Sequence, residues 1–300
     1  MSNPINDIKL QFGNARALYR LIFINVCVFL VIMLTKAVIY LFQLNDSILT
    51  EIISYLSLPS SLHQLMYQPW SLLTYMFLHE GVMHILFNML VLYWSGKLFT
   101  EYLGNEKFWA TFILGGLVGA LFYILAFNLF PAFATTSDAS RLLGASAGVI
   151  AVLVASATLL PDYTVFIFII GPVKLKYIAI VSILLYAISI PNGNAGGEIA
   201  HLGGALFGFV MIKQLRNGRD LTSWLIKFVG IFNGKRKTKM KVVSNNRGGG
   251  FKMDFQGSTQ DSIDRILDKI NRSGFDSLTK DEKEVLYKAL LIEFRSCQIS

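Results

Sequence analysis

Six apolar segments, separated by polar stretches, occupy the first two thirds of the chain. They cover roughly residues 21–39, 82–99, 108–130, 142–160, 177–190 and 199–212. A helix of about 20 apolar residues crosses a hydrocarbon core of roughly 30 Å, and most of these segments approach that length. The last two are shorter, so we expect them to extend into flanking residues. The pattern predicts an all-α, polytopic membrane protein with six transmembrane helices.

The polar stretches divide the chain into four regions. We expect a cytoplasmic N-terminal segment at residues 1–20, a six-helix domain at 21–213, a basic juxtamembrane segment and linker at 214–257, and a small cytoplasmic helical pair at 258–300. The stretch 44–81, between the first two apolar segments, is unusually apolar for a loop and contains prolines. It predicts short helices that lie in the membrane interface.

The composition agrees with this class of protein. Hydrophobic residues make up 54% of the 300 residues and charged residues only 15%, which excludes an ordinary soluble domain. The first twenty residues are polar and contain no small-residue cleavage site, so we expect no cleavable signal. Cys27 falls in a predicted membrane helix and Cys297 in the far C-terminal tail, so we expect no disulfide between them.

Lysines and arginines occur mainly in alternate loops and after the last apolar segment. They include Arg16, Arg20, Lys97, Lys107, Lys174, Lys176, Lys213, Arg216, Arg219, Lys227, Lys235, Arg236, Lys237, Lys239 and Lys241. The intervening loops are almost bare, so the positive-inside rule predicts that both termini are cytoplasmic and that the protein lies in the cell (inner) membrane. The net charge of +8 then indicates contact of the basic juxtamembrane segment with anionic lipid and not binding of nucleic acid.

The C-terminal region has the pattern of two short amphipathic helices. The first has an apolar stripe formed by Ile263, Ile266, Leu267 and Ile270. Thr279 and Glu282 have the T-x-x-E spacing of a capping box, which predicts the start of a second helix. Two helices in about 40 residues bury little surface when alone. We therefore expect this unit to self-associate, to dock on the membrane domain or to bind a cytoplasmic partner.

The second, fourth and sixth predicted membrane helices each carry unusual polar side chains near one end, where such groups are costly and indicate function. His84 and Asn88 are four residues apart in the second helix and therefore share one face. Ser146 lies in the fourth helix and His201 in the sixth. The predicted topology has all three helices start at the outer face, and at about 1.5 Å per residue the four groups lie on the order of 3–10 Å below it.

This set of side chains is suited to acyl transfer. A serine hydroxyl is a weak nucleophile until a neighbouring imidazole removes its proton, and His201 is the candidate base for Ser146. The amide of Asn88, the ring of His84 and the Ser146 backbone N–H are candidate donors to the oxyanion of a tetrahedral intermediate. Asparagine and histidine can also join membrane helices by binding carbonyl groups, which is the alternative interpretation of these residues.

Small residues surround the serine and the histidine. Gly144-Ala145-Ser146-Ala147-Gly148 is a G-x-S-x-G string, and Gly204 and Gly208 follow His201. In soluble hydrolases, such a string places a nucleophilic serine on a sharp turn. In membrane helices, small residues also allow close packing without any catalytic role. We expect these glycines to bring the fourth and sixth helices together.

The motifs together resemble those of a known family. The set Gly144-Ala-Ser146-Ala-Gly148, His84-x-x-x-Asn88 and Ala200-His201-x-x-Gly204-x-x-x-Gly208 is similar to that of the rhomboid intramembrane serine proteases. The resemblance extends from about Gln68 to Lys213 and includes His79. It implies a Ser146–His201 dyad, an oxyanion site from Asn88 and His84, no cofactor, and cleavage of single-pass or polytopic membrane proteins near a transmembrane end.

The sequence departs from the family pattern at two positions. The family often has a Trp-Arg pair in the first loop, where this chain has Trp70-Ser71. Many bacterial members carry a tyrosine four residues after the serine, against which the histidine ring stacks, and here that residue is Ile150. The dyad that the resemblance implies needs no carboxylate, and Glu198 is the only acidic residue near enough in sequence to orient His201.

Three other functions compete with this interpretation. His79-Glu80-Gly81-Val82-Met83-His84 is similar to the zinc motif H-E-x-x-H, but the histidines are five positions apart instead of four, so they do not share one helical face, and we expect no metal. A transporter is disfavoured because the sequence shows no internal repeat and no pair of broken helices. The main alternative is a catalytically silent rhomboid-like scaffold or chaperone that binds membrane proteins.

Overall fold

The computed structural model describes residues 16–136, 139–167, 171–192, 194–232, 264–270, 278–279 and 282. The chain divides into two compact units, Met1–Arg236 and Lys237–Ser300. The first fifteen residues, the basic run at 235–241, the linker and most of the predicted C-terminal helical pair lie outside the described residues.

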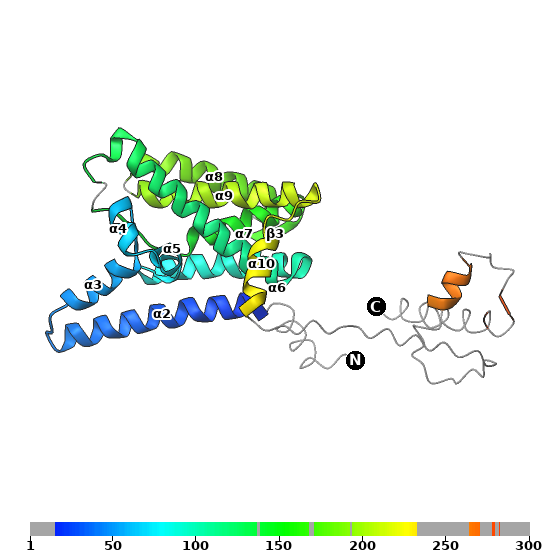
Figure 1. Ribbon diagram of the computed structural model, residues 1–300, viewed down its shortest axis with the longest axis horizontal. Helices are drawn as coiled ribbons and strands as arrows, with labels where there is room; N and C mark the ends of the chain where they lie inside the picture. The colour runs from blue at the N-terminus through cyan, green and yellow to red at the C-terminus, as the bar shows by residue number, and fades with distance from the viewer. Residues whose placement is uncertain are drawn as a thin grey trace. The chain divides into compact units, whose positions relative to one another are not determined.

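Apolar helices lie side by side and form the bundle of the first unit (Figure 1). They are α2 (Arg16–Leu41), α6 (Val82–Leu129), α7 (Ser146–Leu159), α8 (Leu175–Ser189) and α9 (Ala195–Arg216). Among the described residues, α2, α6 and α9 are long and apolar enough to cross a membrane, whereas α7 and α8 are shorter apolar helices. The unit is therefore mostly helical, as the hydrophobic pattern predicts.

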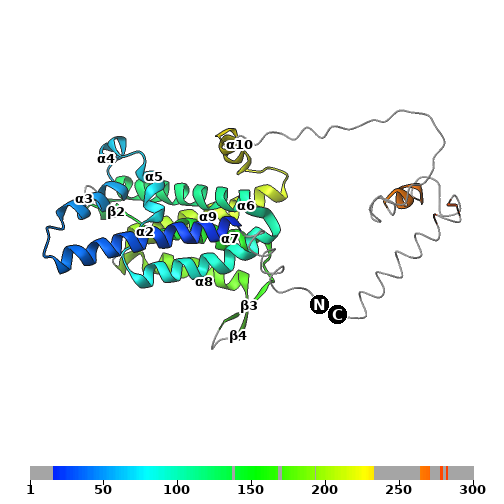
Figure 2. The ribbon, with the colours of Figure 1, turned by 90° about the horizontal axis from the view of Figure 1, so that it is seen from below.

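Helix α6 contains both the second and the third of the predicted segments. Gly104 has non-helical backbone angles, φ 80° and ψ 171°, and the chain turns back at this residue. Phe99 before the turn contacts Phe108 after it, with ring centroids 6.2 Å apart. The two parts of α6 are therefore separate helices that meet at this turn (Figure 2). Glycine permits this reversal because a Cβ atom would strain a positive φ.

Helix α7 is shorter than the hydrophobic pattern predicts. The pattern predicts a helix over residues 142–160, but α7 begins only at Ser146. Leu142 instead pairs with Leu58 in a small antiparallel sheet of β1 (Leu58–Pro59) and β2 (Arg141–Leu142). Gly144 has φ 131°, which lies outside the helical region. Residues 147–157 are all buried, so α7 is surrounded by protein along nearly its whole length.

The loop between α2 and α6 contains short helices, in agreement with the prediction for residues 44–81. They are α3 (Ser47–Leu56), α4 (Leu62–Tyr67), α5 (Ser71–Thr74) and the 3₁₀ helix η1 (Tyr75–Phe77). The indole N–H of Trp70 donates to the Tyr55 carbonyl at 3.0 Å, which holds the loop to itself. Two further 3₁₀ helices, η2 (Pro131–Phe133) and η3 (Ile190–Asn192), lie after α6 and before α9.

Two elements at the end of the bundle that carries the Gly104 turn are absent from the sequence prediction. Strands β3 (Thr164–Ile167) and β4 (Gly171–Lys174) form an antiparallel hairpin between α7 and α8. Helix α10 (Ser223–Phe232) follows α9 and runs across the direction of the bundle helices (Figures 1 and 2). It lies inside the region that the sequence assigns to the juxtamembrane segment.

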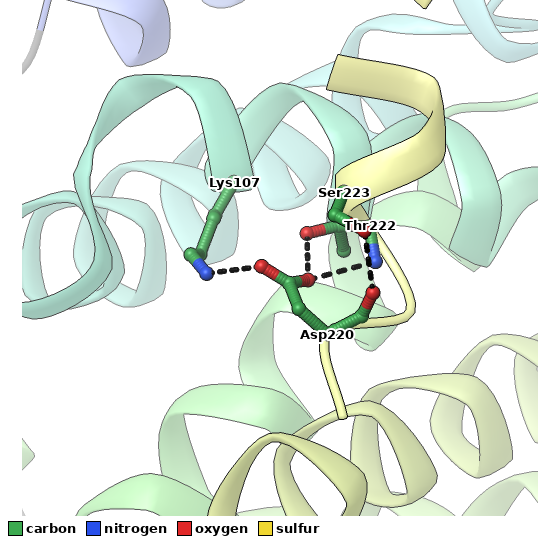
Figure 3. Close-up of polar contacts among 4 residues, drawn as sticks. All are labelled: Lys107, Asp220, Thr222 and Ser223. Carbon is green, nitrogen blue, oxygen red and sulfur yellow. Dashed lines mark hydrogen bonds and ion pairs between the residues drawn. The ribbon is translucent and has the colours of Figure 1, made fainter. Parts of the chain in front are cut away.

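A cluster around Asp220 fixes the start of α10 (Figure 3). The Asp220 carboxylate accepts hydrogen bonds from the Thr222 backbone N–H at 2.9 Å and from its hydroxyl at 2.6 Å. It also forms an ion pair with Lys107, which follows the turn in α6. Burial opposes ionisation of Asp220, but the hydrogen bonds from Lys107 and Thr222 outweigh it and lower the pKa of this carboxyl. The cluster therefore ties α10 to α6.

In the second unit, the described residues contain the predicted capping box. The Thr279 backbone N–H donates to Glu282 Oε2 at 2.8 Å, and the Glu282 N–H donates to Thr279 Oγ1 at 3.3 Å. This reciprocal pair is the geometry of a capping box, so that prediction is confirmed. Residues 264–270 are helical, and Lys269 binds both carboxylate oxygens of Glu282 at 2.9 and 2.8 Å. The remainder of the second predicted helix lies outside the described residues.

Candidate active site

The candidate nucleophile and base are in direct contact. His201 Nε2 lies 2.7 Å from Ser146 Oγ, which is the separation of a hydrogen bond. Ser146 is the first residue of α7, and His201 lies in the second turn of α9. Ser146 and His201 are 55 positions apart in the chain. The fold brings them close enough for the imidazole to take the proton of the serine hydroxyl.

Backbone-to-backbone packing of α9 on α7 sets this separation. A Cβ atom at Gly204 would lie 2.2 Å from the carbonyl oxygen of Ala147, and a Cβ atom at Gly208 would lie 2.2 Å from that of Ala151. Only glycine allows such an approach. Gly148 lies on another face of α7 and packs against Phe112 of α6. The glycines of α9 therefore contact α7 at Ala147 and Ala151 and not at Gly148.

The turn that precedes Ser146 is held in place by two neighbouring elements. Gly144 has a positive φ, and a Cβ atom there would lie 3.1 Å from the ring of His84. The Gly144 N–H donates to the Tyr75 carbonyl of η1 at 2.9 Å. The Tyr75 hydroxyl in turn donates to the Gly116 carbonyl of α6 at 2.7 Å. Glycine at 144 is therefore required both by the backbone angle and by the nearby imidazole.

One cleft of about 350 Å³ collects the four polar side chains that the sequence singles out, His84, Asn88, Ser146 and His201. Most of its other lining residues are apolar, namely Met83, Phe87, Val91, Leu142, Leu143, Val149, Ile150 and Tyr186. Asn88 Nδ2 donates to the His84 carbonyl at 2.9 Å. Because a primary amide carries two N–H groups, Asn88 keeps a second donor for a group bound in the cleft.

His79 packs against His84 just before α6 begins. The two ring centroids are 5.1 Å apart in an edge-to-face arrangement, and His79 is only 3% exposed. Burial, and then the neighbouring charge of His84, lower the pKa of His79 to about 4, so its ring is neutral near pH 7. In the part of the chain that the structure describes, His, Cys, Asp and Glu side chains form no group of three or more that could hold a metal ion.

Comparison with known proteins places the sequence in a family. The family model described as "Rhomboid domain" matches residues 67–217, half of the chain. The chain belongs to the rhomboid family. Its long apolar helices and this domain make it an integral membrane protein.

The chain is also similar to a curated relative and matches a second family model. "RHOMBOID-like protein 12, mitochondrial" of Arabidopsis thaliana is 31% identical over 159 residues, which are 50% of this chain and 47% of that protein. This rhomboid chain therefore spans about half the length of the curated relative that it matches. A family of unknown function, DUF6576, matches residues 256–288, within the region for which the sequence predicts a helical pair.

At the first departure from the rhomboid pattern, an aromatic residue of another helix lies against the histidine. Ile150, four residues after Ser146, is aliphatic, but the ring of Tyr186 in α8 lies against His201 with centroids 4.4 Å apart. Sequence reasoning missed Tyr186 because no local spacing connects α8 to the histidine.

At the second departure, an arginine of another element binds the loop. Ser71 replaces the arginine of the Trp-Arg pair, and its hydroxyl donates to the Gln68 carbonyl at 2.6 Å. The guanidinium that ties this loop comes from Arg141 of β2, which donates to the Ser54 carbonyl at 2.7 Å and to the Gln64 and Gln68 side chains at 3.1 and 3.3 Å. An arginine of strand β2 thus fastens the loop of this rhomboid.

Glu198 also lies next to the candidate dyad. Its Oε2 is 3.4 Å from His201 Nδ1, and the two side chains are 17% and 13% exposed. The dyad that the sequence predicts gives this carboxylate no role, although a spacing of three residues on a helix does bring side chains together.

Proposed function

We propose that this protein is an intramembrane serine protease that cleaves other membrane proteins with a Ser146–His201 dyad. The observation that carries the proposal is the 2.7 Å separation of His201 Nε2 and Ser146 Oγ beside an apolar cleft. A neighbouring imidazole converts a serine hydroxyl into an effective nucleophile. Membership of the rhomboid family adds support, because the spaced motifs of this chain resemble those of its proteases.

In the first half of the reaction, Ser146 Oγ attacks the carbonyl carbon of the scissile peptide bond while His201 Nε2 takes the hydroxyl proton. The carbon–nitrogen bond then breaks, and His201 gives this proton to the leaving amine. In the second half, water attacks the acyl-enzyme ester while His201 takes a proton from it. The ester bond breaks, the proton returns to Ser146 Oγ, and a fragment that ends in a new carboxylate is released.

Three N–H groups can stabilise the oxyanion of each tetrahedral intermediate. They are the second amide hydrogen of Asn88, a ring N–H of His84 and the backbone N–H of Ser146. Because α7 begins at Ser146, its first N–H groups have no carbonyl partner within the helix, and the helix dipole favours negative charge at this end. Donors that are fixed before the reaction stabilise the transition state most effectively.

The length of α7 supports substrates that are themselves embedded in the membrane. Its 14 residues span about 21 Å at about 1.5 Å per residue, whereas the hydrocarbon core measures about 30 Å. Ser146 at its start therefore lies below the membrane surface. A substrate helix hides its carbonyl groups in internal hydrogen bonds, so it must unwind before attack. Cleavage then occurs near the end of a transmembrane segment, in single-pass or polytopic proteins.

The proposed topology has six spans, which are α2, the two parts of α6, α7, α8 and α9. The basic residues near the start of α2 and the end of α9 support cytoplasmic termini in the cell (inner) membrane, with the cleft near the outer face. At the end of the bundle that this topology makes cytoplasmic, α10 lies across the bundle, with Trp224 58% exposed and Lys227 exposed. Such a helix suits the membrane interface, where the basic segment that follows it would contact anionic lipid.

A fluorophosphonate probe tests the proposal, because it reacts covalently with activated serines. We expect the purified wild-type protein to be labelled, Ser146→Ala to remain unlabelled, and His201→Ala to lose most labelling, since the two residues act as one unit. The same variants should fail to cleave a reporter transmembrane substrate in liposomes. Ser182→Ala is the matched control, because the Ser182 hydroxyl bonds only within α8, to the Ile178 carbonyl.

A wild-type protein that is folded but neither labelled nor able to cleave the reporter would contradict the protease function. That result would favour the alternative, a catalytically silent rhomboid-like scaffold or chaperone. Binding of the reporter substrate to the unlabelled protein would then be the measurement to make.

A further inference from the structure

We infer that Glu198 and Tyr186 are positioning residues that hold the His201 imidazole on two sides. The inference rests on the protease function proposed above and adds to it the groups that fix the base. Both side chains contact the imidazole, and the role inferred for each is exerted through His201.

Glu198 faces the imidazole nitrogen that points away from the serine. Its Oε2 lies 3.4 Å from His201 Nδ1, while His201 Nε2 lies 2.7 Å from Ser146 Oγ. A carboxylate can only accept a hydrogen bond, so it favours the tautomer with the proton on Nδ1. The lone pair of Nε2 then faces the serine hydroxyl. Once Nε2 has taken the proton, the carboxylate also stabilises the imidazolium cation.

The first turn of α9 holds Glu198 in this place. Asn194 caps the helix, with its side chain accepting a hydrogen bond from the Gly197 N–H at 3.2 Å. The Glu198 N–H donates to the Asn194 carbonyl at 3.0 Å. Because Glu198 and His201 are three residues apart on the same rigid helix, their side chains meet without any movement of the backbone.

Tyr186 restrains a different surface of the imidazole. Its ring centroid lies 4.4 Å from that of His201, with an interplanar angle of 54°, which is a favourable separation for an aromatic pair. Tyr186 and Ile150 both line the cleft, but only Tyr186 offers an aromatic ring. Packing on the ring from α8 and a carboxylate on its edge from α9 together oppose rotation of the imidazole away from Ser146.

Glu198 variants test the contribution of the carboxylate. Glu198→Gln keeps the size of the side chain and an accepting oxygen but removes the charge, whereas Glu198→Ala removes all three. We expect the rate of fluorophosphonate inactivation and kcat to fall about 3- to 10-fold in the Gln variant and about 10- to 100-fold in the Ala variant. KM should not change, because Glu198 acts on the base and not on substrate binding. Glu51→Gln, an exposed position in α3, controls for the loss of one negative charge.

Tyr186 variants test the contribution of the ring. Tyr186→Phe keeps the ring and should react at close to the wild-type rate, whereas Tyr186→Leu should react about 3- to 10-fold more slowly. Ile150→Tyr introduced into Tyr186→Leu supplies a ring from α7 in the same cleft and should restore part of the rate. Tyr177→Leu, at an exposed position of the same helix, is the matched control and should behave as wild type.

The results separate failure of this inference from failure of the proposed function. If the wild-type protein is not labelled, the proposed function itself is wrong. If it is labelled, and the folded Glu198→Gln, Glu198→Ala and Tyr186→Leu proteins react at the wild-type rate, only the positioning role is overturned. Thermal unfolding of each variant in detergent identifies any loss of fold. If Glu198→Ala is destabilised, the isosteric Glu198→Gln decides the role of the carboxylate. If Tyr186→Leu is destabilised, the role of the ring is decided by whether Ile150→Tyr restores the rate without restoring the unfolding midpoint.

Discussion

Gly204 of α9 faces the backbone of Ala147 in α7 so closely that a Cβ atom at position 204 would lie 2.2 Å from the Ala147 carbonyl oxygen. Ala147 directly follows Ser146, and Gly204 lies almost one helical turn after His201. The contact that joins the two helices is therefore adjacent to the candidate nucleophile on one side and to the candidate base on the other. Any change in the spacing of the helices here changes the distance between the hydroxyl and the imidazole.

Gly204→Ala should therefore weaken both fold and chemistry. The added methyl group forces the α9 backbone away from α7, and overpacking of this kind costs about 1–3 kcal/mol. We expect a lower midpoint of thermal unfolding in detergent and slower fluorophosphonate labelling of Ser146. Gly230→Ala in α10 is the control, since nothing lies within 4 Å of a Cβ atom there. Equal stability and labelling of the two variants would show that the close approach is unimportant.

Asn88→Ala should lower turnover more than it lowers substrate binding. If the second amide hydrogen of Asn88 binds the oxyanion, its loss costs on the order of 100- to 1,000-fold in kcat, as for other single oxyanion donors. Steady-state cleavage of a reporter substrate in liposomes would separate kcat from KM. Asn25→Ala is a matched control, because Asn25 Nδ2 donates to the Leu21 carbonyl of its own helix at 2.9 Å, just as Asn88 does to His84. A change in KM alone would assign Asn88 to substrate binding or helix packing.

The sequence predicts the positions of the helices well but the start of α7 poorly. Apolar residues continue from Leu142 to Leu160 without a charge, and a hydrophobic pattern cannot show that Leu142 pairs in a strand or that Gly144 adopts a positive φ. The convergence of Ser146, His201 and His84 is predictable because each is a costly polar group in an apolar helix. The β3–β4 hairpin is harder to predict, because its strands are only four residues long and the apolar residues around them do not alternate strictly with polar ones.

The two departures from the rhomboid pattern show a second limit of sequence reasoning. Ile150 and Ser71 lack the groups expected at their own positions, yet Tyr186 supplies an aromatic ring and Arg141 a guanidinium from other elements. Only the fold reveals such replacements, because a side chain can be exchanged for one that reaches the same place from a neighbouring helix or strand.

His79 should make the stability of the protein depend on pH between about 6.5 and 4. Burial lowers its folded pKa to about 4, whereas an unfolded histidine titrates near 6.5. Between these values the unfolded chain binds the proton more tightly. The contribution of the neutral His79 ring to the free energy of unfolding is therefore fully present above about pH 6.5 and falls as the pH is lowered through this window. The loss is on the order of 2–3 kcal/mol, and thermal unfolding in detergent at a series of pH values would measure it.

His79→Leu removes the titrating group and should flatten this part of the pH profile. Carboxylates also titrate near the lower end of the window, so the difference between the wild type and the variant is the informative quantity. His63→Leu, at an exposed position of α4, should leave the wild-type profile unchanged. Parallel curves for the wild type and His79→Leu would show that His79 does not gain a proton on unfolding.

Truncation after Lys241 should preserve cleavage of a reporter substrate in detergent. The candidate dyad, the cleft and the Asp220 cluster all lie in the compact unit Met1–Arg236, and the region that matches DUF6576 lies in the other unit, Lys237–Ser300. By the predicted topology, the removed part is on the opposite side of the membrane from the cleft, so it would affect assembly or regulation and not bond cleavage.

The kcat and KM of the truncated and full-length proteins, measured in one detergent with Ser146→Ala as the blank, check this expectation. A truncated protein that keeps its thermal unfolding midpoint but loses kcat would give the C-terminal unit a direct part in catalysis, and a decrease confined to liposomes would assign it to membrane attachment.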